Sequence, residues 1–297
     1  MIEIINVFDF LNEEKSIYKL IVSLQNQTYS VDEIIICDGG STDQSINIIN
    51  TLLQKYKNVF LTKEKSTCRG SGRNIAINHA CNDYIAMIDG GTFPELDWLE
   101  KLVNPLINDN NLEIVYGGVL PITESRFDIC LSTVILSKYY KENILYPSIT
   151  SIIIKKYCWE KVGKFPFNNN KKYVVEDLIF LNKLREHKFK SYVEKTGIVN
   201  WHLSKNYIEI FNRFSSNSRG GISLGFAKKW HYGTFRNLIT YILFICISLK
   251  YPMVFLFLFL YHLLRVYSYI RANNKHNLKI LYLYLWDLMI ISNQILI

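Results

Sequence analysis

The chain lacks the cysteine patterns that mark disulfide-rich and zinc-binding proteins. Its 297 residues include six cysteines, but none forms a Cys-x-x-Cys pair or a Cys/His zinc spacing. Reduced thiols in a cytosolic compartment are therefore the expectation. The first residues also lack a long apolar core and carry several acidic side chains, which does not fit a secretory signal. We expect the polar part of the chain to stay in the cytosol.

The first part of the chain also lacks a basic stripe interleaved with aromatic side chains, the pattern typical of nucleic-acid binding. The net charge is +8, and a group of basic residues flanks the apolar region near the C-terminus. Positive charge beside apolar segments indicates an anionic membrane surface as the partner, and no nucleic acid. No internal repeat and no long disordered linker interrupts the sequence.

Strand-like and helix-like segments alternate through roughly the first 225 residues. Apolar runs predict strands over 3–8, 34–37 and 84–88, and apolar residues at helical spacing lie between them. Further strands are expected over 114–116 and 151–154. This alternation predicts an α/β fold with a mainly parallel sheet and helices on both faces.

A long apolar region follows. From Leu238 to Leu264 the only charge is Lys250, and Pro252 comes next but one. One helix of that length would measure roughly 40 Å at about 1.5 Å per residue, more than the roughly 30 Å hydrocarbon core of a bilayer. A membrane hairpin over about 236–270 returns both basic flanks to the cytosol; a buried soluble hairpin is the alternative. We expect domains over 1–225 and 226–297, with an amphipathic or third membrane helix over 278–297.

Two predicted strands end in an aspartate that is followed by glycines. Asp38 precedes Gly39-Gly40, and Asp89 precedes Gly90-Gly91. Either aspartate alone could cap a following helix. Together, at the carboxyl ends of strands in an open α/β sheet, they indicate a bound nucleotide, with or without a divalent cation.

Several strings in order resemble family 2 glycosyltransferases of the GT-A fold. The similarity covers roughly residues 1–225, and the membrane-associated C-terminus also resembles many family members. The strings are Asn12-Glu13-Glu14, Gln27-Thr28, Ile34 to Asp43, Gly72-Arg73-Asn74 before a helix ending at Ala80, and Tyr84 to Asp89.

The resemblance implies a set of donor-binding residues. Asp38 matches the position that binds the base, usually uracil, whose imide N–H a carboxylate can accept, and Asp43 lies in the adjoining turn. Arg69 and Arg73-Asn74 frame the loop that should approach the diphosphate, for which guanidinium groups are good bidentate partners. Solvated surface charge is the alternative for the arginines.

The resemblance also implies a metal site. Asp89 matches the first carboxylate of an Asp-x-Asp motif that holds a divalent cation, but Gly91 stands where the second aspartate is usual. Mg²⁺ or Mn²⁺ needs few protein ligands when phosphates and waters complete its shell. Asp89 helped by His202 could therefore suffice; metal independence and a structural role for His202 are the alternatives.

The catalytic base is expected in the pair Glu176-Asp177, which matches the family's Glu-Asp pair. Inverting transfer needs a group that takes the acceptor's proton, and a carboxylate serves. Asp177 is the predicted base and Glu176 the alternative; a favourable charge at a helix N-terminus is the structural reading. Arg213 and Arg219 could clamp the diphosphate when a loop closes.

These features predict an inverting glycosyltransferase at the cell membrane with a cytoplasmic catalytic domain. Its donor is a nucleotide-sugar, with a UDP-sugar favoured, and its acceptor is a lipid-linked or envelope glycan. Three alternatives remain open: a nucleotidyltransferase of similar fold, a catalytically inactive nucleotide-sugar-binding protein, and a purely structural membrane protein.

Overall fold

A computed structural model describes residues 2–62, 64, 68–125, 127–129, 131–132, 147–166, 175–203, 206–223 and 227–272. The chain divides into two compact units. The first contains Met1–Leu120, Leu145–Lys171 and Val175–His202, and the second contains Pro121–Ile144, Lys172–Val174 and Leu203–Ile297. The second unit thus begins on the N-terminal side of the predicted boundary at 225. The segment predicted over 278–297 lies outside the described residues.

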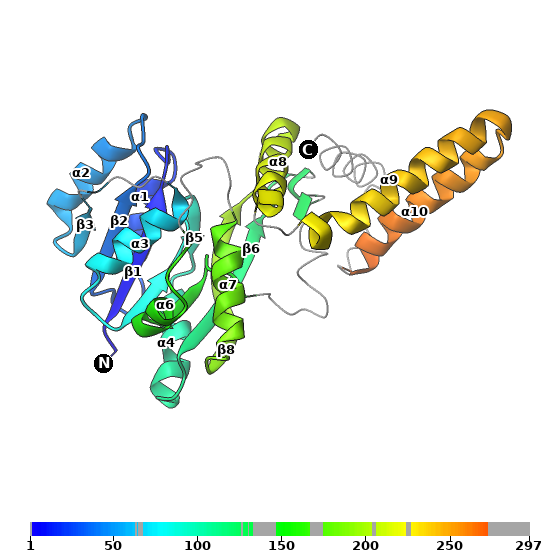
Figure 1. The fold of residues 1–297 in the computed structure, drawn as a ribbon. Coiled ribbons are helices and arrows are strands. Elements are labelled where there is room, and N and C mark those ends of the chain that lie inside the picture. Colours follow the sequence, from blue (N-terminus) through cyan, green and yellow to red (C-terminus); the bar gives the residue numbers. More distant parts are fainter. Residues whose placement is uncertain are drawn as a thin grey trace. The chain divides into compact units, whose positions relative to one another are not determined.

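The first unit is built on an eight-stranded sheet with the order β3-β2-β1-β4-β7-β6-β8-β5 (Figure 1). Its strands are β1 (Ile4–Phe10), β2 (Glu33–Asp38), β3 (Val59–Leu61), β4 (Tyr84–Met87), β5 (Thr92–Pro94), β6 (Ile114–Ile122), β7 (Ile152–Lys155) and β8 (Ser191–His202). β1 pairs in parallel with β2 and β4, and β2 pairs in parallel with β3. This half agrees with the predicted parallel sheet.

The other half of the sheet corrects that prediction. β7 pairs antiparallel with β4 and β6, and β5 pairs antiparallel with β8. The apolar runs at 114–116 and 151–154 did not reveal this, because a strand covered on both faces is apolar along its length whichever way it runs. The sheet is therefore mixed rather than mainly parallel.

Helices cover both faces of the sheet, as predicted. One apolar layer contains α1 (Ile17–Gln25), α2 (Ser45–Lys55) and α4 (Trp98–Asn108), and the other contains α3 (Arg69–His79), α6 (Lys156–Lys161) and α7 (Glu176–Glu186). Each of these layers packs on buried residues of β1: Ile4 and Phe8 on the first face, Ile5 and Val7 on the second. The alternation of these β1 side chains between faces is the period-2 pattern of a strand.

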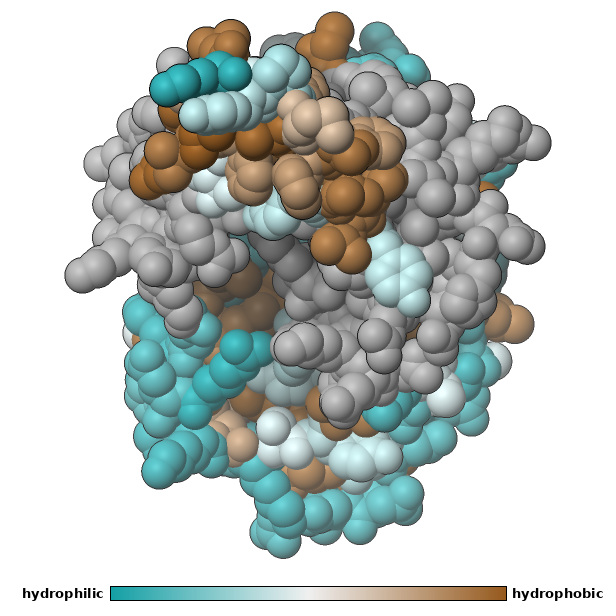
Figure 2. Space-filling view, turned by 90° about the vertical axis from the view of Figure 1, so that its right-hand side faces the viewer, coloured by the Kyte–Doolittle hydropathy of each residue, from teal (hydrophilic) through white to brown (hydrophobic). Residues whose placement is uncertain are grey.

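The second unit contains α8 (Tyr207–Ser223) and a hairpin of α9 (Ala227–Lys250) and α10 (Val254–Ala272), which run side by side (Figure 1). The break between α9 and α10 falls where Lys250 and Pro252 predict it. Large apolar side chains of the hairpin are exposed, including Leu249, Met253 and Leu264. Figure 2 shows apolar side chains gathered at the surface in the upper part of the view.

The prediction that the hairpin crosses a bilayer is not supported. Among the described residues, no helix is both long enough and apolar enough to span a membrane. The helices are longer than the apolar core of the sequence and take in its polar flanks. Thus α9 includes Lys228, Lys229 and Arg236, and α10 includes Arg265 and Arg271.

Candidate active site

The site forms where β1, β2 and β4 end. The register pairs Asp9 with Cys37 and Phe10 with Asp38, so the acidic ends of β1 and β2 lie at the same edge. β4 runs parallel to β1 and ends at Met87, and Asp89 follows two residues later. Carboxylates from separate segments of the sequence therefore meet at one edge of the sheet, where open α/β folds bind ligands.

Arg73 connects these carboxylates from the buried side of α3. Its Nη2 lies 2.7 Å from Asp89 Oδ1, its Nη1 lies 2.9 Å from Glu176 Oε1, and its Nε lies 3.5 Å from Asp9 Oδ1. The Arg73 side chain is 4% exposed. The guanidinium of Arg73 thus faces three carboxylates, and its approach to a diphosphate stays a prediction.

Close packing between α3 and α7 brings Glu176 to Arg73. A Cβ added at Gly70 would lie 2.7 Å from the Pro166 carbonyl oxygen and 3.3 Å from Glu176 Cβ, so only glycine permits this approach. The ring of Phe165 stacks on Phe180 of α7 with centroids 3.9 Å apart. Glu176 and Asp177 occupy the first turn of α7, where the helix dipole favours negative charge.

The carboxyl groups differ in their protonation. Burial and, to a lesser extent, repulsion from Glu176 raise the pKa of Asp177 to about 6 against the opposing charge of Arg73. Burial likewise raises the pKa of Asp9 to about 6 against the charges of Arg73 and Arg69. Burial alone would raise the pKa of Asp89, but Arg73 and the Thr150 hydroxyl hold it below its usual value. The cluster therefore combines a firmly ionised carboxylate with two that accept protons near pH 6.

Asp38 and Asp43 lie in the turn after β2. Asp38 is buried, and its Oδ1 accepts the Ser41 N–H at 2.9 Å. Asp43 accepts the N–H of Ser45 at 3.0 Å through one oxygen and that of Glu14 at 3.1 Å through the other. Asp43 thus fixes the start of α2 against the β1–α1 connection. The Ser41 bond occupies only one of the two oxygens of Asp38.

Asn74 is occupied by the fold. Its Oδ1 accepts hydrogen bonds from Trp159 Nε1 at 2.9 Å and from the Phe165 N–H at 3.0 Å, and its Nδ2 donates to the Phe165 carbonyl at 2.9 Å. These contacts hold α3 against α6 rather than aiming the amide at a donor. Arg69, by contrast, is exposed, and its charge lowers the pKa values of Asp9 and Asp89.

The surroundings of Gly91 decide how a divalent cation would fit. Gly91 has a φ of +76°, and a Cβ added there would lie 3.3 Å from both carboxylate oxygens of Glu13. Glu13 thus fills the space beside the position where the sequence lacks a second aspartate. In the β5–β8 ladder Thr92 pairs with Trp201, which puts His202 next to this turn, with its ring edge on Phe93.

These oxygen donors suit Mg²⁺ or Mn²⁺. Among the described residues, no three or more His, Cys, Asp or Glu side chains are grouped so as to hold a metal by themselves. A cation here would therefore take part of its shell from phosphate and water, which is the usual arrangement for Mg²⁺. Asp89, Glu13 and His202 fit a site in which phosphate and water supply the other ligands of the cation.

Arg213 and Arg219 lie on α8 and are exposed. They belong to the second unit, which the structure describes by itself. Their contact with a diphosphate stays a prediction.

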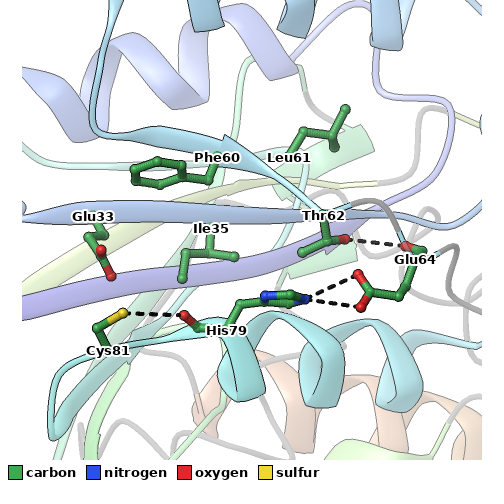
Figure 3. Close-up of a pocket in the computed structure, with 8 residues that line it drawn as sticks. All are labelled: Glu33, Ile35, Phe60, Leu61, Thr62, Glu64, His79 and Cys81. Carbon is green, nitrogen blue, oxygen red and sulfur yellow. Dashed lines mark hydrogen bonds and ion pairs between the residues drawn. The ribbon is translucent and has the colours of Figure 1, made fainter.

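A separate pocket of about 490 Å³ lies beside β2, β3 and the end of α3 (Figure 3). It is lined by Glu33, Ile35, Phe60, Leu61, Thr62, Glu64, His79 and Cys81. In it His79 Nε2 lies 3.1 Å from Glu64 Oε2. None of the predicted site residues lines this pocket, so the carboxylate cluster and not the pocket carries the candidate chemistry.

Sequence reasoning missed three contributors. Glu13 was named only as part of a string, and neither Asp9 nor Thr150 was among the predicted site residues. Thr150 donates its hydroxyl hydrogen bond to Asp89 Oδ2 at 2.7 Å. Their partners lie far along the chain, and sequence spacing carries no signal for such contacts; only the charged aspartate on the mainly apolar β1 was visible as an anomaly.

The solved structures that resemble this chain share its fold. The mannosyltransferase PcManGT from Pyrobaculum calidifontis, in complex with GDP-Man and Mn²⁺, has a TM-score of 0.54 and 17% identity over 72% of this chain and 61% of that one. S. aureus TarS 1-349, in complex with UDP, has a TM-score of 0.50 and 14% identity over 78% of this chain and 74% of that one.

Sequence comparison identifies the family. A Haemophilus influenzae protein named "Uncharacterized glycosyltransferase" is 38% identical over 109 residues, which are 36% of this chain and 43% of that protein. The matched part thus spans less than half of that relative. The model of glycosyl transferase family 2 matches residues 7–184, more than half of the chain. The chain therefore belongs to glycosyl transferase family 2.

Proposed function

We propose that this enzyme moves a sugar from a nucleotide-sugar donor to an acceptor hydroxyl with inversion at the anomeric carbon. The observation that carries the proposal is the Arg73 cluster. One guanidinium contacts Asp89, at the sheet edge suited to a donor, and Glu176, which is adjacent to Asp177. Through Arg73, the donor-side carboxylate of Asp89 and the acceptor-side carboxylates of Glu176 and Asp177 would thus act on the same reacting atoms.

Asp177 is the proposed base. The acceptor oxygen forms a bond to the anomeric carbon as the bond from that carbon to the phosphate oxygen breaks. The acceptor's proton passes to the Asp177 carboxylate, and the electron pair of the broken bond stays on the leaving nucleoside diphosphate. Burial and the neighbouring Glu176 raise the pKa of Asp177 to about 6. Asp177 is therefore ionised at neutral pH yet more basic than an ordinary aspartate, as a general base should be.

Mg²⁺ or Mn²⁺ is the proposed cofactor, held by Asp89 and Glu13 with His202 beside them. When bound, the cation would neutralise negative charge that develops on the leaving diphosphate. The position of Glu13 beside Gly91 supports these ligands. Glu13 supplies a carboxylate at the place where the turn after β4 has glycine instead of a second aspartate. The hydrogen bonds to Asp89 from Arg73 and Thr150 would orient that ligand.

The donor's base is proposed to lie at Asp38 and its diphosphate near Arg69. A buried carboxylate with one oxygen uncommitted by the Ser41 bond can accept the imide N–H of uracil. It could equally accept the N–H groups of guanine, so this residue favours a base with such donors without choosing between them. A UDP-sugar is the donor we propose, with a GDP-sugar as the competing one.

The acceptor is proposed to be a lipid-linked or envelope glycan, reached from the cytoplasmic surface of the cell membrane. The exposed apolar side chains of the hairpin support contact with lipid, and basic residues on both of its helices suit anionic headgroups. We propose contact with the membrane surface rather than a span.

A donor panel tests the proposal. Wild-type protein is incubated with UDP- and GDP-sugars, with and without Mn²⁺, and released nucleotide, sugar and pyrophosphate are measured. We expect slow release of UDP or GDP from one donor, faster with Mn²⁺. Release of pyrophosphate from UTP or GTP in a parallel incubation with a sugar 1-phosphate would instead indicate a nucleotidyltransferase. Binding without any turnover would indicate an inactive binding protein, which the glycine at position 91 favours as the alternative.

A further inference from the structure

We propose that Arg73 is a positioning residue, which holds the carboxylates of Asp89 and Glu176 in one fixed arrangement and does not itself bind the donor's diphosphate. The inference rests on the proposed function, because it takes Asp177, the neighbour of Glu176, as the base.

The geometry of the guanidinium carries the first step. Each of its three nitrogens lies near a different carboxylate: Nη2 near Asp89 at 2.7 Å, Nη1 near Glu176 at 2.9 Å, and Nε near Asp9 at 3.5 Å. These carboxylates follow β4, begin α7 and end β1. A planar fork with fixed donor directions can hold several carboxylates at set angles, whereas an ammonium group is a point charge. Arg73 therefore fixes the three elements relative to one another.

Packing around Arg73 carries the second step. Its Cζ lies 5.5 Å from the centroid of the Phe165 ring, and that ring stacks on Phe180 of α7. The side chain is 4% exposed. An arginine that reached a phosphate would have to leave this position, and Glu176, itself 9% exposed, would lose its charge partner in a buried site. Leaving a buried charge unpaired is strongly unfavourable, so the arrangement opposes a phosphate-binding role.

The consequence for the reaction concerns Asp177. Glu176 and Asp177 are consecutive in the first turn of α7, and Asp177 Oδ1 accepts the Leu178 N–H at 2.8 Å. Anchoring Glu176 fixes the direction of that turn and hence where the Asp177 carboxylate points. The charged groups that act on Asp177 are Glu176, Arg73 and Asp89. Arg73 thus acts on the base both through position and through charge.

Two substitutions of Arg73 separate position from charge. Arg73→Lys keeps the charge but loses the fork, and Arg73→Gln loses both. The matched control is Arg185→Lys, which makes the same change at an exposed arginine of α7. Affinities for UDP, uridine, GDP and guanosine are measured by calorimetry. Turnover is followed against pH as hydrolysis of the UDP- or GDP-sugar that the wild type cleaves fastest.

We expect both variants to lose about 10²-fold or more in turnover, the cost of small misplacement at a reacting centre. The preference for UDP over uridine, or for GDP over guanosine, should stay unchanged. In Arg73→Gln the acid limb of the pH profile should move to higher pH, because the Arg73 charge lowers the pKa of Asp177. Arg73→Lys should leave that limb in place.

The inference is overturned if the variants lose diphosphate affinity selectively while nucleoside affinity is kept, because Arg73 would then be a phosphate ligand. It is also overturned if Arg73→Lys turns over at the rate of the Arg185→Lys control. Should Arg73→Gln fail to fold, the Lys variant alone decides between these results. If Asp177→Asn is inactive but Arg73→Lys is normal, the inference fails and the proposed function stands.

Discussion

At the scale of single residues, Asp9 makes stability depend on pH in a defined direction. The Asp9 carboxyl is 8% exposed, and burial raises its pKa to about 6 despite the charge of Arg73. Between about pH 4 and pH 6 the folded protein keeps a proton that the unfolded chain, with an ordinary aspartate pKa near 3.9, has released. The folded state therefore binds more protons, and stability falls as pH rises through this window.

Asp9→Asn tests this directly. We expect the melting temperature of the wild type to fall between pH 4.5 and pH 6.5, and Asp9→Asn to flatten part of that slope. The slope of melting temperature against pH that remains in Asp9→Asn should come largely from Asp177, whose pKa is also raised. The Asp9 contribution is of order 1–3 kcal/mol at about 1.4 kcal/mol per pKa unit. A slope identical in Asp9→Asn and wild type, measured by calorimetry in matched buffers, would contradict the assignment.

Glu13 is the proposed second carboxylate ligand of the divalent cation. Its carboxylate oxygens lie 3.3 Å from a Cβ added at Gly91. We expect Glu13→Gln to weaken Mn²⁺ binding in the presence of UDP or GDP by about 10-fold or more, measured from the electron paramagnetic resonance signal of free Mn²⁺. Glu14→Gln is the control, since Glu14 is exposed and accepts the Gln44 N–H. Equal Mn²⁺ affinity in the two variants would remove Glu13 from the site.

At the scale of elements, the contact between α3 and α7 depends on Gly70. Replacing glycine by alanine inside a helix normally stabilises it by about 1 kcal/mol. Here the added Cβ would approach the Pro166 carbonyl oxygen to 2.7 Å and Glu176 to 3.3 Å. Neither a backbone oxygen nor an anchored carboxylate can yield without moving α7, so steric cost outweighs helix propensity.

We therefore expect Gly70→Ala to lower both the melting temperature and turnover. Gly72→Ala, two residues further along the same helix, is the comparison. Thermal unfolding and donor hydrolysis are measured on both variants. A Gly70→Ala protein that is more stable than wild type and fully active would show that the two helices do not pack this closely.

The sequence predicted the elements better than their contacts. The strands that lead to Asp38 and Asp89, and the helices with apolar faces, followed from periodicity and were found. The inward position of Arg73 also had a signal, since Arg73, Ala76 and Ile77 share one buried face of α3 at helical spacing. What the sequence does not encode locally is which distant carboxylate meets Arg73, because Glu176 lies 103 residues away. The direction of the strands that follow β4 could not be predicted either, because it also depends on pairing between distant segments.

At the scale of the whole molecule, the exposed hairpin predicts binding to anionic membranes. We expect the full chain to float with vesicles of phosphatidylglycerol and phosphatidylcholine, and less with phosphatidylcholine alone. Leu249→Glu with Met253→Glu should abolish flotation, since these side chains are 84% and 73% exposed. Ile208→Glu on α8, where Ile208 is 72% exposed, is the control. Wild type that stays unbound, or that forms a concentration-dependent dimer instead, would contradict lipid as the partner.

The central claim is that Asp177 takes the proton of the acceptor in a cluster organised by Arg73. The most direct test measures donor affinity, melting temperature and turnover for Asp177→Asn and Glu176→Gln. We expect Asp177→Asn to keep donor affinity and fold but to lose about 10²–10⁴-fold in turnover, the usual contribution of a general base. Turnover of Asp177→Asn within a few-fold of wild type would contradict it; if Glu176→Gln alone were inactive, the base would be the preceding residue.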